Sequence, residues 1–185
     1  MTATRESGAV GILAPGYRLP AATRVGTVRL QVGDLERSLA YYQGVLGFRL
    51  LGRDGQGASL GAAGDAGPLV RLHELRGAVP APEQGRLGLY HFAILLPDRP
   101  SLGRFLRHLA ELGERAGASD HLVSEALYLR DPDGLGIEVY ADRPRSSWQM
   151  RDGQISMATN PLDVDGLIAA AEGTPWTGLP AGTTI

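Results

Sequence analysis

Residues 28–42 read VRLQVGDLERSLAYY, and this stretch decides the fold. Apolar and polar side chains alternate over Thr27–Val32, which is the pattern of a strand with one buried face. Asp34 follows a turn and suits the N-cap of a helix over Leu35–Val45. The apolar residues of this helix recur at helical spacing, at Leu35, Leu39, Tyr42 and Leu46. The stretch therefore predicts a half-buried strand that leads into an amphipathic helix.

The same pattern occurs twice along the chain. After the first helix, short strands bounded by glycine-rich turns are predicted at 48–52, 58–62 and 69–75. A connector rich in Gly and Pro, residues 76–87, then interrupts the pattern. The second series is a strand at 90–96, a helix at 102–112, and strands at 121–123, 126–130 and 136–140. Both halves therefore read as a strand, a helix and three strands.

Two pairs of positions relate the halves to each other. Thr27 lies seven residues before Asp34, and His91 lies seven residues before Asp98. Each of these aspartates is predicted to be the N-cap of a helix. The offset between the halves is 64 residues. Such repeats pack as a pair, because each unit has one face of a small sheet to bury. We therefore predict an α+β fold in which two paired βαβββ modules form one curved-sheet cup.

The same patterns predict the domain organisation. Residues 1–23 lack periodicity and are predicted to be an N-terminal arm. The cup domain covers 24–143, with its modules at 24–78 and 87–143. Residues 144–185 change in character, with many Gly, Pro and Thr residues and a short helix candidate at 162–171. We predict that this tail is a C-terminal extension or linker.

Composition excludes several kinds of chemistry. The 185-residue chain has no cysteine and no lysine, and its 18 basic residues are all arginine. Disulfides, thiol nucleophiles, Schiff-base lysines and Walker-type phosphate loops are thereby excluded. The net charge of −2 argues against nucleic-acid binding, and no apolar run is long enough for a membrane span. Gly8–Ala14 is apolar but lacks a clear cleavage site, so we predict a cytoplasmic protein.

Several stretches carry a resemblance to a known family. They are Val28–Tyr42, Val45–Phe48, Asp120–Tyr128, Asp131–Gly134 and Gly136–Tyr140. Together they resemble the vicinal oxygen chelate superfamily, which contains glyoxalases, bleomycin-resistance proteins and extradiol dioxygenases. The resemblance covers about residues 24–143 and implies a cup that holds a divalent metal. Gly88–Pro97 and the tail are also similar to the amino-terminal half of catechol 2,3-dioxygenases.

The resemblance implies four metal-ligand positions, which read Thr27, Arg71, His91 and Glu138 in this chain. Iron-dependent ring-cleaving members use two histidines and one carboxylate from the first, third and fourth of these positions. Here the first histidine is replaced by Thr27. We expect His91 and Glu138 to hold Fe(II) or Mn(II) if the site is functional, and no cofactor otherwise.

Other interpretations of these residues stay open. His91 and Glu138 could be remnants of an ancestral site, because two protein ligands hold a metal poorly. Arg71 could pair with Glu138 and take the charge role of the metal. His73 shares a strand face with Arg71 and could act as a substitute ligand, or it could lie hydrogen-bonded in the sheet. Arg71, His73 and Thr27 form the expected substrate-binding set.

Two further residues are candidates for proton transfer. Tyr128 lies ten residues before Glu138. In extradiol dioxygenases a tyrosine at the matching place orients the substrate, although Tyr128 could equally line the cup without a catalytic role. His121 could act as a general base, because the usual pKa of histidine is near neutrality, or it could only stabilise a loop.

These residues support functions of different classes. The first is a catechol 2,3-dioxygenase-like unit that opens the ring of a small aromatic diol. The second is a metal-free domain with a degenerate metal site, which binds a small molecule or serves as a scaffold. A glyoxalase-like lyase or isomerase is a third alternative. Trp148 and Trp176 could pack the tail onto the domain or onto a second copy, and we expect a homodimer.

Overall fold

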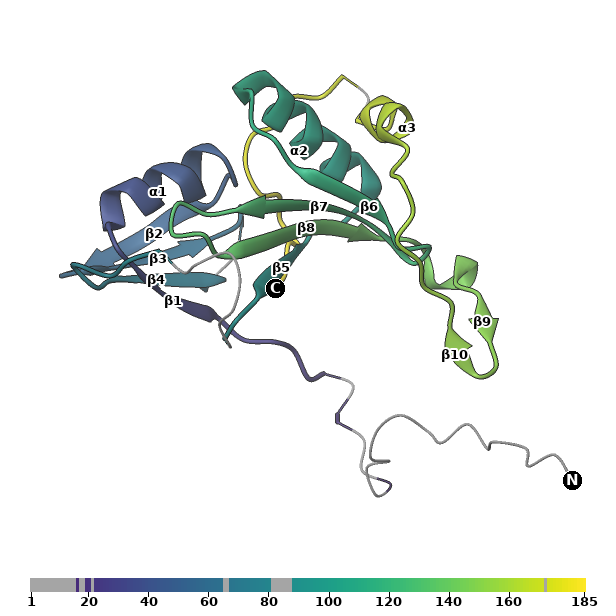
Figure 1. The fold of residues 1–185 in the computed structure, drawn as a ribbon, viewed down its shortest axis with the longest axis horizontal. Coiled ribbons are helices and arrows are strands. Elements are labelled where there is room, and N and C mark those ends of the chain that lie inside the picture. Colours follow the sequence, from purple (N-terminus) through teal and green to yellow (C-terminus); the bar gives the residue numbers. More distant parts are fainter. Residues whose placement is uncertain (1–15, 17–18, 21, 65–66, 81–87, 172) are drawn as a thin grey trace, which may run out of the picture.

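The structure is a computed structural model that describes residues 16, 19–20, 22–64, 67–80, 88–171 and 173–185. The predicted arm, residues 1–23, lies almost entirely outside the described residues, as does 81–87 in the predicted connector. Each half of the described chain folds into one βαβββ unit (Figure 1). The prediction of an α+β fold with two such modules is confirmed.

The first module contains one helix and a four-stranded sheet. Its elements are β1 (Val28–Val32), α1 (Leu35–Gly44), β2 (Arg49–Asp54), β3 (Gly57–Gly61) and β4 (Val70–Glu74). The strands lie in the order β1-β4-β3-β2, and β1 runs parallel to β4. Asp34 is the N-cap predicted for α1, since its side chain accepts a hydrogen bond from the Arg37 backbone N–H at 2.9 Å.

The second module repeats this topology. Its elements are β5 (His91–Leu95), α2 (Arg99–Leu112), β6 (Gly117–Asp120), β7 (Ser124–Arg130) and β8 (Gly136–Asp142). The order is β5-β8-β7-β6, with β5 parallel to β8. Asp98 caps α2 by accepting from the Ser101 backbone N–H at 2.7 Å. The helix begins at Arg99, before the predicted start at residue 102, because Pro100 is tolerated in a first turn.

One predicted strand is misplaced. The sequence predicts a strand at 121–123, whereas β6 ends at Asp120. Leu122 has a φ of 69°, which no strand residue adopts, and its N–H donates to the Asp120 side chain at 2.8 Å. The short apolar pair Leu122–Val123 therefore belongs to the turn between β6 and β7. Aspartate side chains that bind the backbone in this way favour turns over strands.

Both helices cover the same side of the two sheets, and the opposite side is open (Figure 1). The buried side chains of both modules form one continuous hydrophobic core, which includes Leu39 and Tyr42 of α1 and Phe105 of α2. Because this core crosses the boundary between the modules, the two sheets are held as one cup. Residues on the open face are consequently free to build a site.

The Asp131–Gly134 turn joins the second module to the first. The Tyr42 hydroxyl on α1 donates to the buried Asp131 carboxylate at 3.1 Å. Asp133 pairs with Arg37 at 2.5 Å and accepts from the Gly33 backbone N–H at 3.0 Å. Burial raises the pKa of Asp131, because the ionised carboxylate is unfavourable in this buried junction. In the sequence, Asp131–Gly134 stands out only as one of the stretches that carry the family resemblance.

The tail lies along the second module and reaches the first. It contains the short helix η1 (Arg145–Ser147), a hairpin of β9 (Met150–Arg151) and β10 (Gln154–Ile155), and α3 (Val164–Ala169). Trp176 stacks on His108 with ring centroids 6.0 Å apart and contacts Phe105 of α2. Thr184 exchanges backbone hydrogen bonds with Leu95. No described helix is long and apolar enough to cross a membrane.

A partly buried cluster of ion pairs links β7, the start of α2 and the tail. The Glu125 side chain on β7 is 2% exposed, and Arg99 contacts it through two hydrogen bonds of 2.6 and 3.0 Å. Arg143 bridges Glu125 and Asp120, and Arg99 also donates to the Gly166 carbonyl of α3. The cluster satisfies a carboxylate that burial would otherwise penalise. Its residues lie on the helix side of the sheet, away from the open face.

Candidate functional site

His91 and Glu138 meet on the open face of the second sheet. They come from the neighbouring parallel strands β5 and β8, in which Ala93 is the register partner of Glu138. The alternation of side chains along a strand turns both residues to the same face. His91 Nε2 lies 3.1 Å from Glu138 Oε2, and their side chains are 34% and 16% exposed. The pair is therefore accessible to a small molecule.

Tyr128 extends this pair across the sheet. It stands directly opposite Glu138 on the antiparallel strand β7, and its hydroxyl donates to Glu138 Oε1 at 3.1 Å. Burial, together with the negative charge of Glu138, raises the pKa of Tyr128 to about 12. The phenol therefore holds its proton firmly at neutral pH.

His121 completes a line of four polar side chains, His91, Glu138, Tyr128 and His121, which we call the polar row. Its Nε2 lies 2.6 Å from the Tyr128 hydroxyl, and its Nδ1 lies 2.7 Å from the Ala158 carbonyl oxygen. The tail thus fixes one nitrogen of this histidine. Ala158 escapes sequence analysis, because it acts through a backbone carbonyl that carries no residue-type signal.

Proton positions in the polar row follow from the atoms that can only accept. The Ala158 carbonyl accepts, so His121 Nδ1 carries a proton. Tyr128 has one hydroxyl proton for two neighbours, His121 Nε2 and Glu138 Oε1. If His121 is neutral and Glu138 is ionised, the single hydroxyl proton can serve only one of these contacts. Both contacts are hydrogen bonds only if one additional proton is present, on His121 Nε2 or on Glu138. The Tyr128 hydroxyl and His121 Nε2 are thus the atoms of the row between which a proton could be exchanged directly.

The remaining predicted residues lie on the first module. The Thr27 hydroxyl donates to the Pro68 carbonyl at 2.7 Å, which leaves only its oxygen lone pairs for a ligand. Arg71 and His73 lie on β4 and line a cavity. The hypothesis that Arg71 pairs with Glu138 is not supported, because the contacts of Glu138 with described residues are to His91 and Tyr128.

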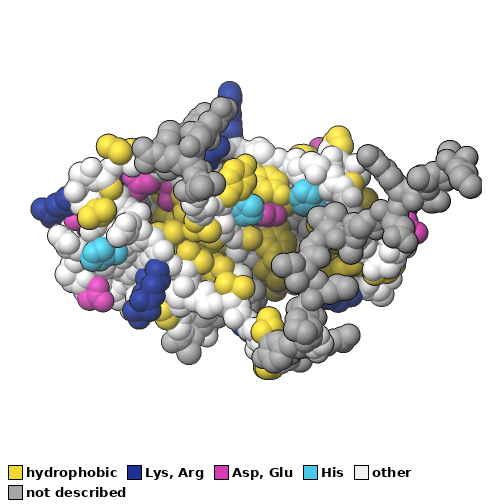
Figure 2. All heavy atoms as spheres, turned by 60° about the horizontal axis from the view of Figure 1, so that its bottom comes forward, with side chains coloured by type: hydrophobic (Ala, Val, Ile, Leu, Met, Phe, Trp, Pro, Cys, Tyr) yellow, Lys and Arg dark blue, Asp and Glu magenta, His cyan; other side chains and the backbone are white. Residues whose placement is uncertain are grey.

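Two adjoining cavities open on this side of the molecule. The larger, of about 990 Å³, lies against β1, β3 and β4 and is lined by Arg71 and His73. The smaller, of about 400 Å³, is lined by His91 and Tyr128. Tyr90 and Arg130 border both cavities. Figure 2 shows hydrophobic side chains across this face, with a histidine beside an acidic side chain.

The donors of the polar row match a divalent metal in type but not in number. An imidazole and a carboxylate suit Fe(II) or Mn(II). However, no group of three or more His, Cys, Asp or Glu side chains that could hold a metal occurs among the described residues. Thr27 does not supply the third strong donor, because a neutral hydroxyl is a weak metal ligand beside imidazole or carboxylate. The protein donors thus fall one short of a facial triad.

A repeated βαβββ fold with polar residues on its open face defines a class of proteins built as paired modules. Residues 24–139 match the family model of the glyoxalase/bleomycin resistance protein/dioxygenase superfamily, and the chain belongs to this family. The expected family is therefore confirmed.

Known relatives agree with this assignment. The chain is 49% identical over 164 residues to a catechol-2,3-dioxygenase of Bacillus subtilis, an alignment that covers 88% of this chain and 57% of that protein. The chain thus spans little more than half of that relative's length. A glyoxalase/bleomycin resistance protein/dioxygenase domain from Frankia is 26% identical, with a TM-score of 0.53 over 65% of this chain and 98% of that one. A glyoxalase/dioxygenase from Nostoc punctiforme shows the same fold, at 22% identity and a TM-score of 0.54 over 72% and 98% of the two chains.

Proposed function

We propose that this chain is a catechol 2,3-dioxygenase-like unit that binds a small aromatic diol at the polar row. The observation that carries the proposal is the unbroken contact from His91 through Glu138 and Tyr128 to His121, beside an open cavity. The 49% identity to a catechol-2,3-dioxygenase supports the substrate class. An aromatic diol presents two adjacent hydroxyl groups, which the polar row can bind by donating and accepting hydrogen bonds.

Each residue has a defined role in this proposal. The Tyr128 hydroxyl orients one oxygen of the diol and passes a proton to or from His121 Nε2, which lies 2.6 Å away. The Ala158 carbonyl fixes the other His121 nitrogen, so the exchange occurs at Nε2 alone. Arg71, His73 and Thr27 contact the rest of the substrate from the first module. Tyr128 and His121 are the proposed catalytic residues.

His91 and Glu138 are the proposed protein ligands for Fe(II) or Mn(II). Their chemistry suits either metal, although a third strong protein donor is missing among the described residues. The same shortage favours the second candidate function, a metal-free domain that binds a small aromatic molecule. The two functions share the polar row and differ in whether this chain retains a metal.

Metal analysis of the 185-residue chain, purified without chelator, separates the two functions. The first predicts stoichiometric Fe or Mn that is lost in His91→Ala, together with ring cleavage of catechol followed by absorbance. The matched control is His108→Gln, since His108 lies on α2 and contacts the Gly44 carbonyl and Trp176, which are outside the polar row. Metal-free wild-type protein that still binds catechol would establish the second function and overturn the first.

Two further properties belong to this proposal. We infer that the protein acts in the cytoplasm, where many small aromatic compounds are degraded. We also infer that it forms a homodimer, which sedimentation analysis of the purified chain tests directly. Trp176 is not available for a dimer contact, because it packs on His108 and Phe105 of its own chain.

A further inference from the structure

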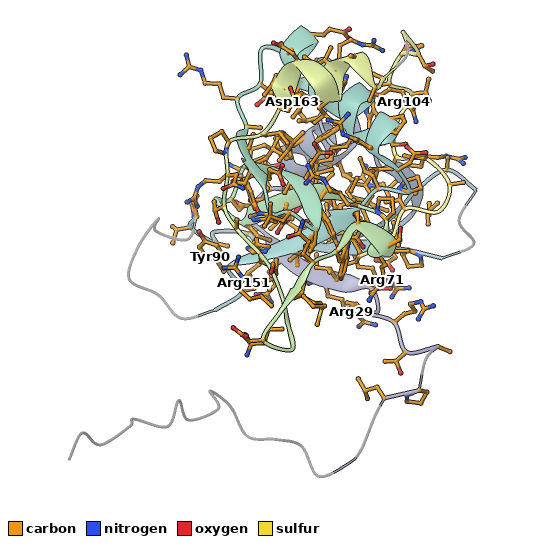
Figure 3. All side chains as sticks on the ribbon, turned by 90° about the vertical axis from the view of Figure 1, so that its right-hand side faces the viewer. Arg29, Arg71, Tyr90, Arg104, Arg151 and Asp163 are labelled. Atoms are coloured by element: carbon orange, nitrogen blue, oxygen red, sulfur yellow. The ribbon has the colours of Figure 1, made fainter. Side chains whose placement is uncertain are left out.

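Two arginines stand side by side on the open face of the first sheet. Arg29 on β1 and Arg71 on β4 are register partners in neighbouring parallel strands. Both side chains are exposed and line the larger cavity, and Figure 3 shows them close together at one end of the molecule. His73 lies two residues beyond Arg71 and therefore shares this face. The first sheet thus presents a concentrated positive charge to the cavity.

Neither arginine has an acidic partner among the described residues. The hydrogen bonds and ion pairs that the described residues form include no contact of Arg29 or Arg71. The two guanidinium groups are exposed, so their mutual repulsion is weak and screened, and an anion bound between them would be attracted by both. This feature points to a ligand that carries negative charge.

Asp131, Asp133 and Arg130 also line the cavity and contact other described residues, and the Asp54 carboxylate lines it as well. Asp133 pairs with Arg37, and Asp131 accepts from Tyr42. Arg130 donates to the Gly134 carbonyl at 3.1 Å. Asp54 lies at the end of β2 with its carboxylate over Gly57, where an added Cβ would meet it at 2.5 Å. Arg29 and Arg71 are thus the arginines of this lining that form no hydrogen bond or ion pair with a described residue.

The cavity beside the arginines continues to the polar row. Tyr90 and Arg130 border both cavities, and the Tyr90 ring lies edge-on to His91 with centroids 5.3 Å apart. A ring held beside His91 and Tyr128 can therefore extend a substituent past Tyr90 toward β1 and β4. Together the volumes of about 990 and 400 Å³ exceed the needs of an unsubstituted ring.

We propose that Arg29 and Arg71 bind the carboxylate of a substituted aromatic diol. The planar guanidinium group donates two parallel hydrogen bonds to a carboxylate, which gives both charge and direction. The proposed ligand is therefore a diol ring that carries a short acidic side chain, with the hydroxyls at the polar row and the carboxylate at the first sheet. This inference rests on the proposed function and names its substrate class.

Calorimetric binding tests this with three probes, 3,4-dihydroxyphenylacetate, catechol and phenylacetate. The variants are Arg71→Gln, Arg29→Gln and the double variant. The control is Arg151→Gln on the β9–β10 hairpin, which removes the same charge from an exposed position outside the cavity lining. Circular dichroism and thermal unfolding confirm that each variant folds, and both cavity arginines are exposed, so their loss leaves the core intact.

The expected result is that wild type and the control bind 3,4-dihydroxyphenylacetate more tightly than catechol. Each single variant should weaken 3,4-dihydroxyphenylacetate binding by about tenfold, the effect of one lost charge-assisted hydrogen bond, and weaken catechol binding by much less. The preference should also shrink in high salt, because the guanidinium groups are exposed and screened.

The remaining outcomes separate this inference from the proposed function. Equal binding of the two diols would overturn the carboxylate site and leave the diol function standing. Arginine-dependent binding of phenylacetate with no binding of either diol would support the anion site and overturn the diol function. Binding of none of the three probes would overturn both.

Discussion

Tyr128 holds the central position of the polar row, because its hydroxyl contacts both His121 and Glu138. A phenol between a base and a carboxylate responds to the charge on either neighbour. Its pKa is therefore the most direct measure of the electrostatics of the site.

Replacing Glu138 by Gln should lower the pKa of Tyr128 from about 12 toward its ordinary value of 10.0. The negative charge of Glu138 opposes ionisation of the phenol, so its removal favours the phenolate. Burial keeps part of the shift. The measurement is a titration of tyrosinate absorbance, in which the difference between Glu138→Gln and the double variant with Tyr128→Phe isolates this residue.

Glu111→Gln is the control for this titration, because Glu111 is 67% exposed on α2 and pairs with Arg107. It should leave the pKa of Tyr128 where it is in the wild type. A pKa of Tyr128 that stays near 12 in Glu138→Gln would show that burial, and not the charge of Glu138, causes the shift.

Single residues also show how far sequence can predict a site. His91, Glu138, Tyr128 and His121 are identified through the family resemblance, and the structure brings the four into one row of successive contacts. Their roles stay predictions. The Ala158 carbonyl could not be predicted, because any residue at that position offers the same atom and its placement depends on the path of the tail.

At the scale of elements, the packing of α3 on α2 determines how the tail is fixed. Gly103 on α2 lies against the α3 backbone, where an added Cβ would stand 2.2 Å from the Leu167 carbonyl oxygen. The absence of a side chain is what allows the two helices to approach. Leu167 and Ala171 are buried in this contact region.

Gly103→Ala should lower the free energy of unfolding by about 1–3 kcal/mol, because the helices must separate to admit the methyl group. Gly44→Ala is the matched control, since Gly44 also lies in a helix but has no atom within 4 Å of its added Cβ. It should be neutral or raise stability by up to about 1 kcal/mol. Denaturant unfolding measures both, and equal effects would contradict the close α2–α3 contact.

Elements differ in how well sequence predicts them. The two long helices and β1 follow from apolar periodicity and aspartate caps, which are local signals. The strand predicted at 121–123 is wrong. Its two apolar residues are adjacent and form no alternating pattern, and the Asp120 side chain stabilises a turn at Leu122. Apolar periodicity predicts a strand least well where the segment is short and its neighbours are polar.

At the scale of the whole molecule, the Asp131–Gly134 turn couples the two modules. Asp131 accepts hydrogen bonds from the Tyr42 hydroxyl and from the backbone N–H groups of Asp133 and Leu135. The hydrogen bond from Tyr42 crosses from one module to the other. Because the hydrophobic core is also continuous, the modules should unfold together.

Asp131→Ala should lower the free energy of unfolding by about 2–4 kcal/mol, because one buried and two part-buried donors lose their acceptor. Asp131→Asn should cost less, since it keeps the shape and one acceptor and removes a charge whose burial is unfavourable. Differential scanning calorimetry should show one transition for wild type. Two separate transitions in the wild type, or equal stability of Asp131→Ala and wild type, would contradict the coupling.

The fold repeats itself, yet the two halves of its lining do not. The second sheet offers an imidazole and a carboxylate, and the first offers paired guanidinium groups at the related strands. A duplicated scaffold with matching linings would accept an elongated guest in either of two head-to-tail directions. This one distinguishes the ends, so divergence after duplication has given the cup a polarity, and any guest that touches both sheets is held in a single sense.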